Sequence, residues 1–240
     1  MNSLSDNQVS LYEEPVQEKI RKFIKIEFLL NKIYYFKSKD NKSENYIALL
    51  ALCELYEILL RSDIKSELIR EIETQNAYLQ KIKEIPQADG SKLNSVLEKQ
   101  NQLLKLIYSI EINYLDHLEH DIFFKTLLKN CFTQLQPASV DFWLSRDILN
   151  RETQIDRWLE PLMFIKRSID FILEVIRKSG RFEDRMAEKG FFIEKLDPKK
   201  NILLIRVTLT SDLYYYPQIS VGKQRLTIMF MTKDDKNNLV

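Results

Sequence analysis

Apolar residues recur every three or four positions over most of residues 16–180, which is the spacing that keeps side chains on one face of a helix. The first such stripe begins at Val16 and extends to about Phe36. The same spacing predicts further helices over about residues 44–60, 63–83, 91–110 and 114–130. We therefore expect a helical region that makes up the larger part of the chain.

Polar residues and helix breakers mark the ends of these helices. The segments 37–45, 61–63 and 85–91 are polar or contain proline and glycine, so each is expected to be a connection. Pro137 opens a short further helix. Pro161 would remove a hydrogen bond from a helix interior, so we expect a break just before it and another helix after it.

The periodicity changes in the last quarter of the chain. Three segments rich in β-branched and aromatic residues occur there, at 190–196 (GFFIEKL), 202–209 (ILLIRVTL) and 225–231 (RLTIMFM). They predict antiparallel strands, with the polar segment DPKKN at 197–201 as a hairpin loop between the first two. Residues 9–13, within the segment VSLYEEP, are a candidate edge strand.

These patterns predict a mostly helical α+β fold, in which a helical bundle carries a small antiparallel sheet. The helical domain is expected to span residues 14–180. The small β domain is expected to combine residues 9–13 with residues 189–232. Residues 1–8 and 233–240 are expected to be loose termini.

Alternation within the predicted strands separates an aliphatic face from a polar face. In the strand over 202–209 the aliphatic residues share one face, and Arg206 points the other way. In the last strand the aliphatic residues again share a face, and Arg225 opposes it. If both aliphatic faces pack against the helices, Arg206 and Arg225 lie together on the exposed face of one sheet.

The residues before the last strand add to this expected surface. Lys223 stands in the adjoining turn, and Tyr214 to Tyr216 supply aromatic surface. Pro217 cannot donate a hydrogen bond inside a sheet, so its segment is expected to be an edge strand or a crossover. Arginine and tyrosine are favoured at protein interfaces, and a free sheet edge can receive an extended peptide. The simpler alternative is a solvated basic face without a partner.

Composition and charge exclude several classes of protein. The 240 residues carry 36 Lys and Arg and 35 Asp and Glu, a net charge of +1, and include four glycines. Phosphate-binding loops, dinucleotide fingerprints and nucleophile elbows need clustered glycines, which this chain lacks. A net charge near zero also argues against general nucleic-acid binding. Residues 177–240 nevertheless carry 13 Lys and Arg against 8 Asp and Glu, so this part is the better match for an acidic partner.

Candidate catalytic and metal-binding chemistry is sparse. Cys53 and Cys131 lie on apolar helix faces and are expected to be inert thiols in a reducing compartment. His117 and His120 stand among carboxylates, but zinc needs further ligands and the chain has no third histidine. We therefore predict no catalytic residue, no metal and no cofactor. No apolar run reaches about 18 residues and no secretion signal is evident, so a cytoplasmic protein without membrane insertion is expected.

Two segments near the ends of the chain resemble the ZapD family. The segment LYEEPVQEKIRKFIKIEFLL at 11–30 has the family's aromatic-acid-x-proline entry to a basic helix and its Glu-Phe-Leu step. The segment LYYYPQISVGKQRLTIMFM at 213–231 has the Tyr-Pro-Gln-Ile-Ser motif, a basic turn, and an arginine before an alternating strand. The order of elements between them also fits, so the resemblance covers nearly the whole chain.

The resemblance implies a non-enzymatic, cytoplasmic homodimer that acts at midcell during division. Members of the family bind the C-terminal tail of FtsZ, the tubulin-like division GTPase, and bundle its filaments into the Z-ring. Arg225 matches the family's arginine and Lys223 its basic turn, and with Arg206 these are the predicted partner-binding residues. The family tends to carry an arginine on a mid-chain helix where this chain has Ile122, with Lys125 one turn further on.

Two other functions stay open at this stage. One is a non-enzymatic adaptor for a different acidic and hydrophobic peptide, because the chemistry of the predicted surface does not identify its partner. The other is an enzyme in an unfamiliar helical fold. The scarcity of glycine and the lack of a catalytic or ligand set weigh against the enzyme.

Overall fold

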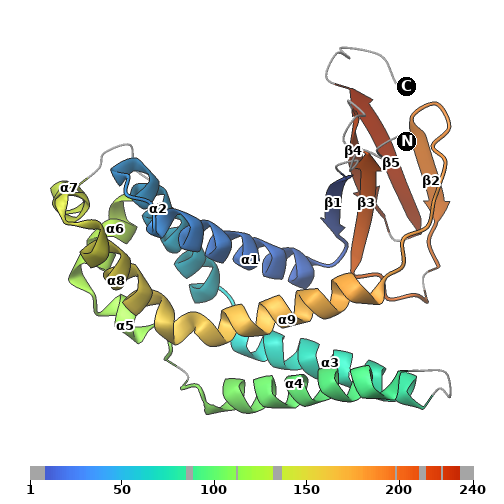
Figure 1. Ribbon diagram of the computed structural model, residues 1–240, viewed down its shortest axis with the longest axis horizontal. Coiled ribbons are helices and arrows are strands. Elements are labelled where there is room, and N and C mark those ends of the chain that lie inside the picture. Colours follow the sequence, from blue (N-terminus) through green and yellow to red (C-terminus); the bar gives the residue numbers. More distant parts are fainter. Residues whose placement is uncertain are drawn as a thin grey trace, which may run out of the picture. The chain divides into compact units, whose positions relative to one another are not determined.

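The structure is a computed structural model that describes residues 9–84, 89–111, 113–131, 137–197, 199–210, 215–222 and 224–232 (Figure 1). Contacts between residues divide the chain into two compact units. One unit is Phe23–Glu174, and the other combines the residues up to Lys22 with those from Val175 onward. The α+β fold predicted from the sequence is confirmed.

The helices agree closely with the hydrophobic periodicity. They are α1 (Glu18–Lys37), α2 (Lys42–Leu60), α3 (Ile64–Lys83), α4 (Gly90–Ser109), α5 (Asp116–Glu119), α6 (Ile122–Asn130), α7 (Ala138–Ser145), α8 (Ile148–Leu159), the 3₁₀ helix η1 (Glu160–Leu162) and α9 (Met163–Ser179). The expected break at Pro161 is present as η1, a tighter turn that tolerates the missing hydrogen bond.

One helix that was predicted to be continuous is divided into two in the structure. The apolar spacing over 114–130 predicted a single helix, but the chain forms α5 and α6 there. The carboxylate of Asp121 accepts a hydrogen bond from the backbone N–H of Phe124 at 2.8 Å, so Asp121 caps the start of α6. A short polar side chain satisfies the free N–H groups of a helix start, which favours a new helix over continuation of the old one.

The core of the helical unit is aliphatic on α1 and α2 and aromatic around α6. Ile26, Leu29 and Ile33 of α1 are fully buried. The ring of Phe123 in α6 stacks with the rings of Trp143 in α7 and Trp158 in α8, with a centroid distance of 5.9 Å to each. Stacked aromatic rings add to the stability that comes from their buried area.

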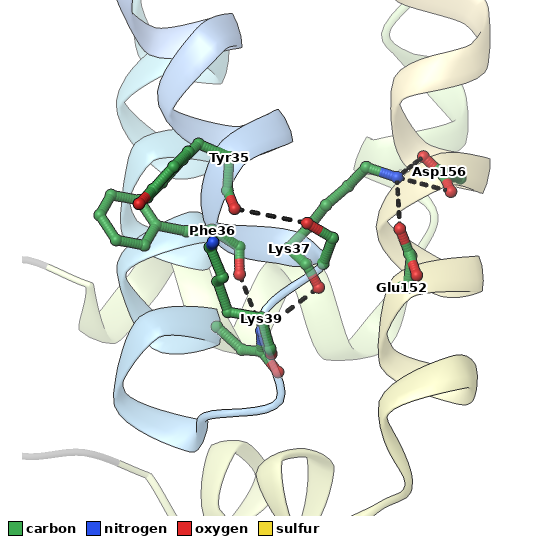
Figure 2. Close-up of polar contacts among 8 residues, drawn as sticks. Tyr35, Phe36, Lys37, Lys39, Glu152 and Asp156 are labelled. Carbon is green, nitrogen blue, oxygen red and sulfur yellow. Dashed lines mark hydrogen bonds and ion pairs between the residues drawn. The ribbon is translucent and has the colours of Figure 1, made fainter.

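A buried lysine joins the end of α1 to α8. The ammonium of Lys37 donates hydrogen bonds to Asp156 at 2.7 and 2.9 Å and to Glu152 at 3.1 Å (Figure 2). Burial by itself lowers the pKa of Lys37, but the hydrogen bonds to Asp156 and Glu152 outweigh it, so the pKa is raised above its ordinary value. Lys37 is therefore charged and held in place by two carboxylates.

The strands of the second unit form two separate antiparallel sheets. Strand β1 (Val9–Pro15) pairs with β3 (Leu204–Thr210). Strands β2 (Phe191–Lys195), β5 (Arg225–Thr232) and β4 (Tyr215–Val221) form a three-stranded sheet in that order. The expected strand at residues 9–13 is confirmed. The expected hairpin was wrong, because the strands on either side of 197–201 pair with other partners.

The two sheets share one small hydrophobic core. Leu196, Leu226 and Ile228 are buried at its centre. Aliphatic side chains of β3, including Ile205 and Val207, pack against this centre from the two-stranded sheet. The aliphatic faces of β3 and β5 therefore point toward each other, and the alternate residues of each strand point away from the shared core.

No helix among the described residues is both long enough and apolar enough to cross a membrane.

The ion pairs of Lys37 predict a pH-dependent contribution to stability. Lys37→Met should lower the free energy of unfolding by about 1–2 kcal/mol at neutral pH, less than the loss from a fully buried pair, because both carboxylates stay partly solvated. Since the folded-state pKa of Lys37 is raised, the contribution is complete below the ordinary lysine pKa and is lost as the pH rises through the folded-state value.

Urea unfolding of the wild type and of Lys37→Met between about pH 7 and 11 measures this effect, with the exposed Lys81→Met as control. The difference between wild type and Lys37→Met should be constant up to about pH 9 and shrink above about pH 10.5. A difference that grows with pH, or that Lys81→Met reproduces, would contradict the assignment.

Candidate functional site

The face of the three-stranded sheet that points away from the shared core is the candidate site, and we call it the outer face. Its members follow from the register of the strands. They are Phe191, Ile193 and Lys195 of β2, Arg225, Thr227, Met229 and Met231 of β5, and Tyr216, Gln218 and Ser220 of β4. Ile193 is 61% exposed and Tyr216 is 49% exposed, so the outer face is open to solvent in the unit described.

The outer face changes in chemistry along the strands. At one end, Lys195 lies opposite Arg225 in the register. Toward the other end, Phe191 lies opposite Met229, and Tyr216 lies opposite Met231. Because a strand rises about 3.3 Å per residue, the basic end and the apolar end are about 20 Å apart. A peptide that carries carboxylates beside apolar residues matches this gradient.

The basic end consists of two like charges side by side. The backbone N–H of Leu196 donates to the carbonyl of Gln224 at 2.8 Å. Lys195 and Arg225 are therefore a pair without mutual backbone hydrogen bonds, the kind in which side chains approach most closely. Both side chains are exposed, and among the residues that the structure describes neither has a carboxylate partner. Like charges in this position repel, so a bound carboxylate would relieve the repulsion.

The outer face borders a free strand edge. Among the residues that the structure describes, β4 pairs with β5 alone, and the backbone N–H of Gly222 donates to the carbonyl of Arg225 at 2.8 Å. In an antiparallel ladder, pairs that share backbone hydrogen bonds alternate with pairs that do not. Gly222 and Arg225 form a hydrogen-bonded pair, so Pro217 and Phe230, five pairs further along, form a pair without hydrogen bonds. The nitrogen of Pro217 therefore faces the free edge of β4. The edge-strand alternative expected for Pro217 is therefore correct, and the missing N–H disrupts no pairing.

Two of the predicted surface residues are not placed by the structure. Lys223 and Tyr214 lie outside the described residues. The remaining tyrosines separate, because Tyr216 lies on the outer face and Tyr215 alternates to the core side of β4. Arg225 is exposed at the position that its alternation predicts.

Arg206 differs from its predicted position. The sequence placed it with Arg225 on the exposed face of one sheet, but β3 and β5 belong to different sheets that pack through their aliphatic sides. Arg206 and Arg225 therefore lie on opposite sides of the β unit. The reason is that β3 pairs with β1 and not with β2, a choice that the alternation of a single strand does not specify.

The guanidinium of Arg206 is engaged within the chain. Its Nε lies 3.1 Å from Oε1 of Glu13, and its Nη1 donates to the carbonyl of Arg177 at 3.0 Å. Its Cζ lies 5.0 Å from the ring centre of Phe182, a cation–π contact. The side chains of Glu13 and Arg206 are mostly buried. These contacts support a structural role for Arg206.

Glu13 also binds Arg177 at the end of α9. The Nε of Arg177 donates to the Glu13 carboxylate at 3.0 and 3.2 Å, and Nη2 donates at 2.8 Å. One carboxylate thus holds two guanidinium groups, and we call Glu13, Arg177 and Arg206 the Glu13 cluster. It connects β1, α9 and β3 within one unit.

Lys195 is the charged residue of the outer face that the sequence did not identify. Its strand was expected to form a hairpin with 202–209, which would have put Lys195 far from Arg225. The pairing of β2 with β5 brings the two together. The alternation of FFIEK, which puts Ile193 and Lys195 on one face, was the available signal.

The other candidate residues lie in the helices or at their ends. His117 contacts the carbonyl of Trp158 at 2.8 Å, and His120 contacts the carbonyl of Asp116 at 2.7 Å. The described residues contain no group of three possible metal ligands. Burial and the neighbouring Cys131 raise the pKa of the Cys53 thiol, so Cys53 is protonated.

Ile122, where the resemblance implied an arginine, is 83% exposed at the start of α6, and Lys125 is exposed one turn further on.

Comparison with known proteins gives one consistent match. The sequence profile of the ZapD family, described as a cell division protein, matches residues 24–229. A cell division protein ZapD of Methylococcus capsulatus is 30% identical over 233 residues, which cover 94% of this chain and 90% of that protein. The ZapD proteins of Azoarcus sp. (strain BH72) and Coxiella burnetii are 27% and 25% identical, and the matches cover 92% and 95% of this chain and 89% and 90% of theirs.

The Glu13 cluster predicts that one carboxylate holds the N-terminal strand in place. Glu13→Gln should lower the free energy of unfolding by about 2–3 kcal/mol, because it leaves two mostly buried guanidinium groups without a counter-charge. Amide hydrogen exchange in β1 should become faster. The adjacent Glu14→Gln is the control, since Glu14 pairs with Arg21 at an exposed position and should cost less than about 1 kcal/mol. Equal effects of the two substitutions would refute this role.

Proposed function

Because the chain belongs to the ZapD family of cell division proteins, we propose that it binds the C-terminal tail of FtsZ and cross-links FtsZ filaments into bundles. In this proposal the protein is a non-enzymatic homodimer that acts in the cytoplasm at midcell and supports assembly of the Z-ring. The outer face of the three-stranded sheet is the tail-binding site.

The observation that carries the proposal is the uncompensated pair of Lys195 and Arg225 beside an apolar surface. The tail's carboxylates would lie against this pair, and its apolar residues would lie along Phe191, Met229 and Tyr216. Arg225 supplies a planar fork of donors that can bind a carboxylate through two hydrogen bonds. Lys223, in the chain between β4 and β5, remains a predicted contributor. Arg206 is left out, because its charge is already paired with Glu13.

The same surface would also suit an adaptor for a different acidic and apolar peptide. Both proposals use Lys195 and Arg225, so substitutions of these residues alone do not distinguish the two functions. The sequence of the bound peptide distinguishes them. An FtsZ tail peptide and a scrambled peptide of the same composition present the same total charge, and only the first presents the tail's order of residues.

Loss of the arginine should weaken tail binding without unfolding the protein. A charge-assisted contact contributes about 1.5–3 kcal/mol, so Arg225→Ala should reduce affinity for the FtsZ tail by about 10- to 150-fold. Arg225→Lys should restore part of the affinity, because a point charge cannot reproduce a bidentate contact. Lys195→Ala should also weaken binding. The measurements are co-sedimentation with FtsZ polymers and fluorescence anisotropy with the tail peptide.

The matched control is Lys200→Ala, an exposed basic residue outside the outer face. It should bind the tail as the wild type does. Binding should also fall as the salt concentration rises from about 50 to 300 mM, since exposed charges are screened. If Arg225→Ala and Lys200→Ala bind alike at both salt concentrations, the site lies elsewhere. Equal binding of the scrambled peptide would favour the adaptor.

Bundling requires two tail-binding sites held together, so a homodimer is expected. Light scattering should give twice the chain mass of 28.7 kDa at micromolar concentrations. The wild type should bundle FtsZ filaments, and Arg225→Ala should remain dimeric but bundle poorly. A mass of one chain under conditions in which bundling persists would rule out the dimer as the cross-linking species.

A further inference from the structure

Helix α1 and the turn that follows it carry a row of exposed aromatic rings and partly or fully exposed lysines. The row consists of Lys25, Phe28, Lys32, Tyr35 and Lys39, and we call it the lysine–aromatic row. Phe28 is 56% exposed and Tyr35 is 59% exposed. Large aromatic side chains that are exposed along one helix are typical of a surface that binds a partner.

The ammonium groups lie over the ring faces. The Nζ atoms of Lys25 and Lys32 are each 5.9 Å from the ring centre of Phe28. The Nζ of Lys39 is 4.4 Å from the ring centre of Tyr35. These cation–π contacts order the long side chains and hold positive charge beside each ring.

The end of the row is held in place by a buried amide. The side-chain nitrogen of Asn45 donates to the carbonyls of Phe36, Lys37 and Lys39, at 2.9, 3.3 and 2.9 Å. Asn45 is fully buried. The turn that carries Lys39 is therefore fixed relative to α1, and the last lysine of the row has a defined position.

The positive charge of the row is only partly compensated. Lys25 pairs with Glu54 of α2 at 2.6 Å. Within the described residues, no carboxylate forms an ion pair with Lys32 or Lys39. A second copy of the same row would place lysine against lysine, and this repulsion argues against self-association through it. The occupant that the charges favour is acidic.

The spacing of the row favours a helix as the occupant. Within α1 the lysines stand at 25 and 32 and the rings at 28 and 35, so each type recurs after seven residues, or about 10.5 Å along the helix, and Lys39 follows in the turn after it. A partner helix with the same repeat would meet the two lysines and the two rings of α1 in turn. In an extended peptide about three residues span this distance, and odd spacing puts successive side chains on opposite faces.

A membrane surface fits the row less well. An interfacial helix inserts its apolar side chains below the headgroups. Here lysine ammonium groups already lie over both rings, so inserting the rings would bury charge with them.

We propose that the lysine–aromatic row of α1 is a docking surface for an acidic amphipathic helix. The partner carries a carboxylate every seven residues to match the lysines, with apolar residues between them that pack on Phe28 and Tyr35. This site lies in the helical unit, and the outer face of the three-stranded sheet belongs to the other unit.

The test uses two designed probe peptides of about 21 residues. One repeats Glu and Leu at heptad positions on an alanine and glutamine background, and the other has the same composition in scrambled order. Binding to the full chain is measured by fluorescence anisotropy at low salt. The heptad peptide should bind at least about tenfold more tightly than the scrambled peptide.

Variants of the row give the second part of the test. The double substitution Lys32→Glu and Lys39→Glu should weaken binding of the heptad peptide at least about tenfold, and Phe28→Ala should also weaken it. Lys105→Glu, on an exposed position of α4, is the matched control and should leave binding unchanged.

Three results would overturn the proposal. The heptad and scrambled peptides could bind alike, or the double variant could bind as well as the wild type. Finally, neither peptide could bind, while vesicles rich in phosphatidylserine bind the wild type but not the variant that lacks Lys32 and Lys39. That result would assign the row to a membrane surface. Circular dichroism of each variant verifies that the chain is folded.

Discussion

The arrangement of the β unit depends on one carboxylate. Glu13 accepts hydrogen bonds from Arg177 and lies beside the guanidinium of Arg206, so a single side chain connects the N-terminal strand, the end of α9 and β3. With β3 paired to β1, strand β2 pairs with β5, and the strands divide into two sheets over a common core. This division puts Arg225 and Lys195 together on an open face. The proposed binding surface is thus a consequence of pairing that takes place on the other side of the unit.

Local sequence patterns were sufficient for the helices and insufficient for the pairing of strands. Helical spacing and caps depend on residues within one or two turns of each other, and the predicted boundaries agree with the structure to within a few residues at most ends. Alternation correctly separated Ile205 and Val207 from Arg206, because it too is local. Which strand pairs with which depends on packing between distant segments, and this is why the expected hairpin across 197–201 was wrong.

The basic residues show why the candidate site was only partly predictable. From sequence, Arg206 and Arg225 look alike, since each is an arginine that opposes an aliphatic strand face. In the structure Arg206 is paired with Glu13, and Arg225 stands beside Lys195 without a described carboxylate partner. Lys37, also unremarkable in sequence, is buried between Glu152 and Asp156. What separates structural cations from candidate binding cations is the neighbouring acid, which only the fold supplies.

The pairing of β1 with β3 has a consequence for biosynthesis. In the register of this sheet Val9 lies opposite Thr210, so the two partners are separated by about 200 residues of chain. At a synthesis rate of roughly 5–20 residues per second, the N-terminal strand leaves the ribosome about 10–40 seconds before its partner is made. The helical unit can form during this interval, whereas β1 has to remain unpaired. An unpaired strand is a template for association, so chaperone binding to the nascent chain is most useful during this interval.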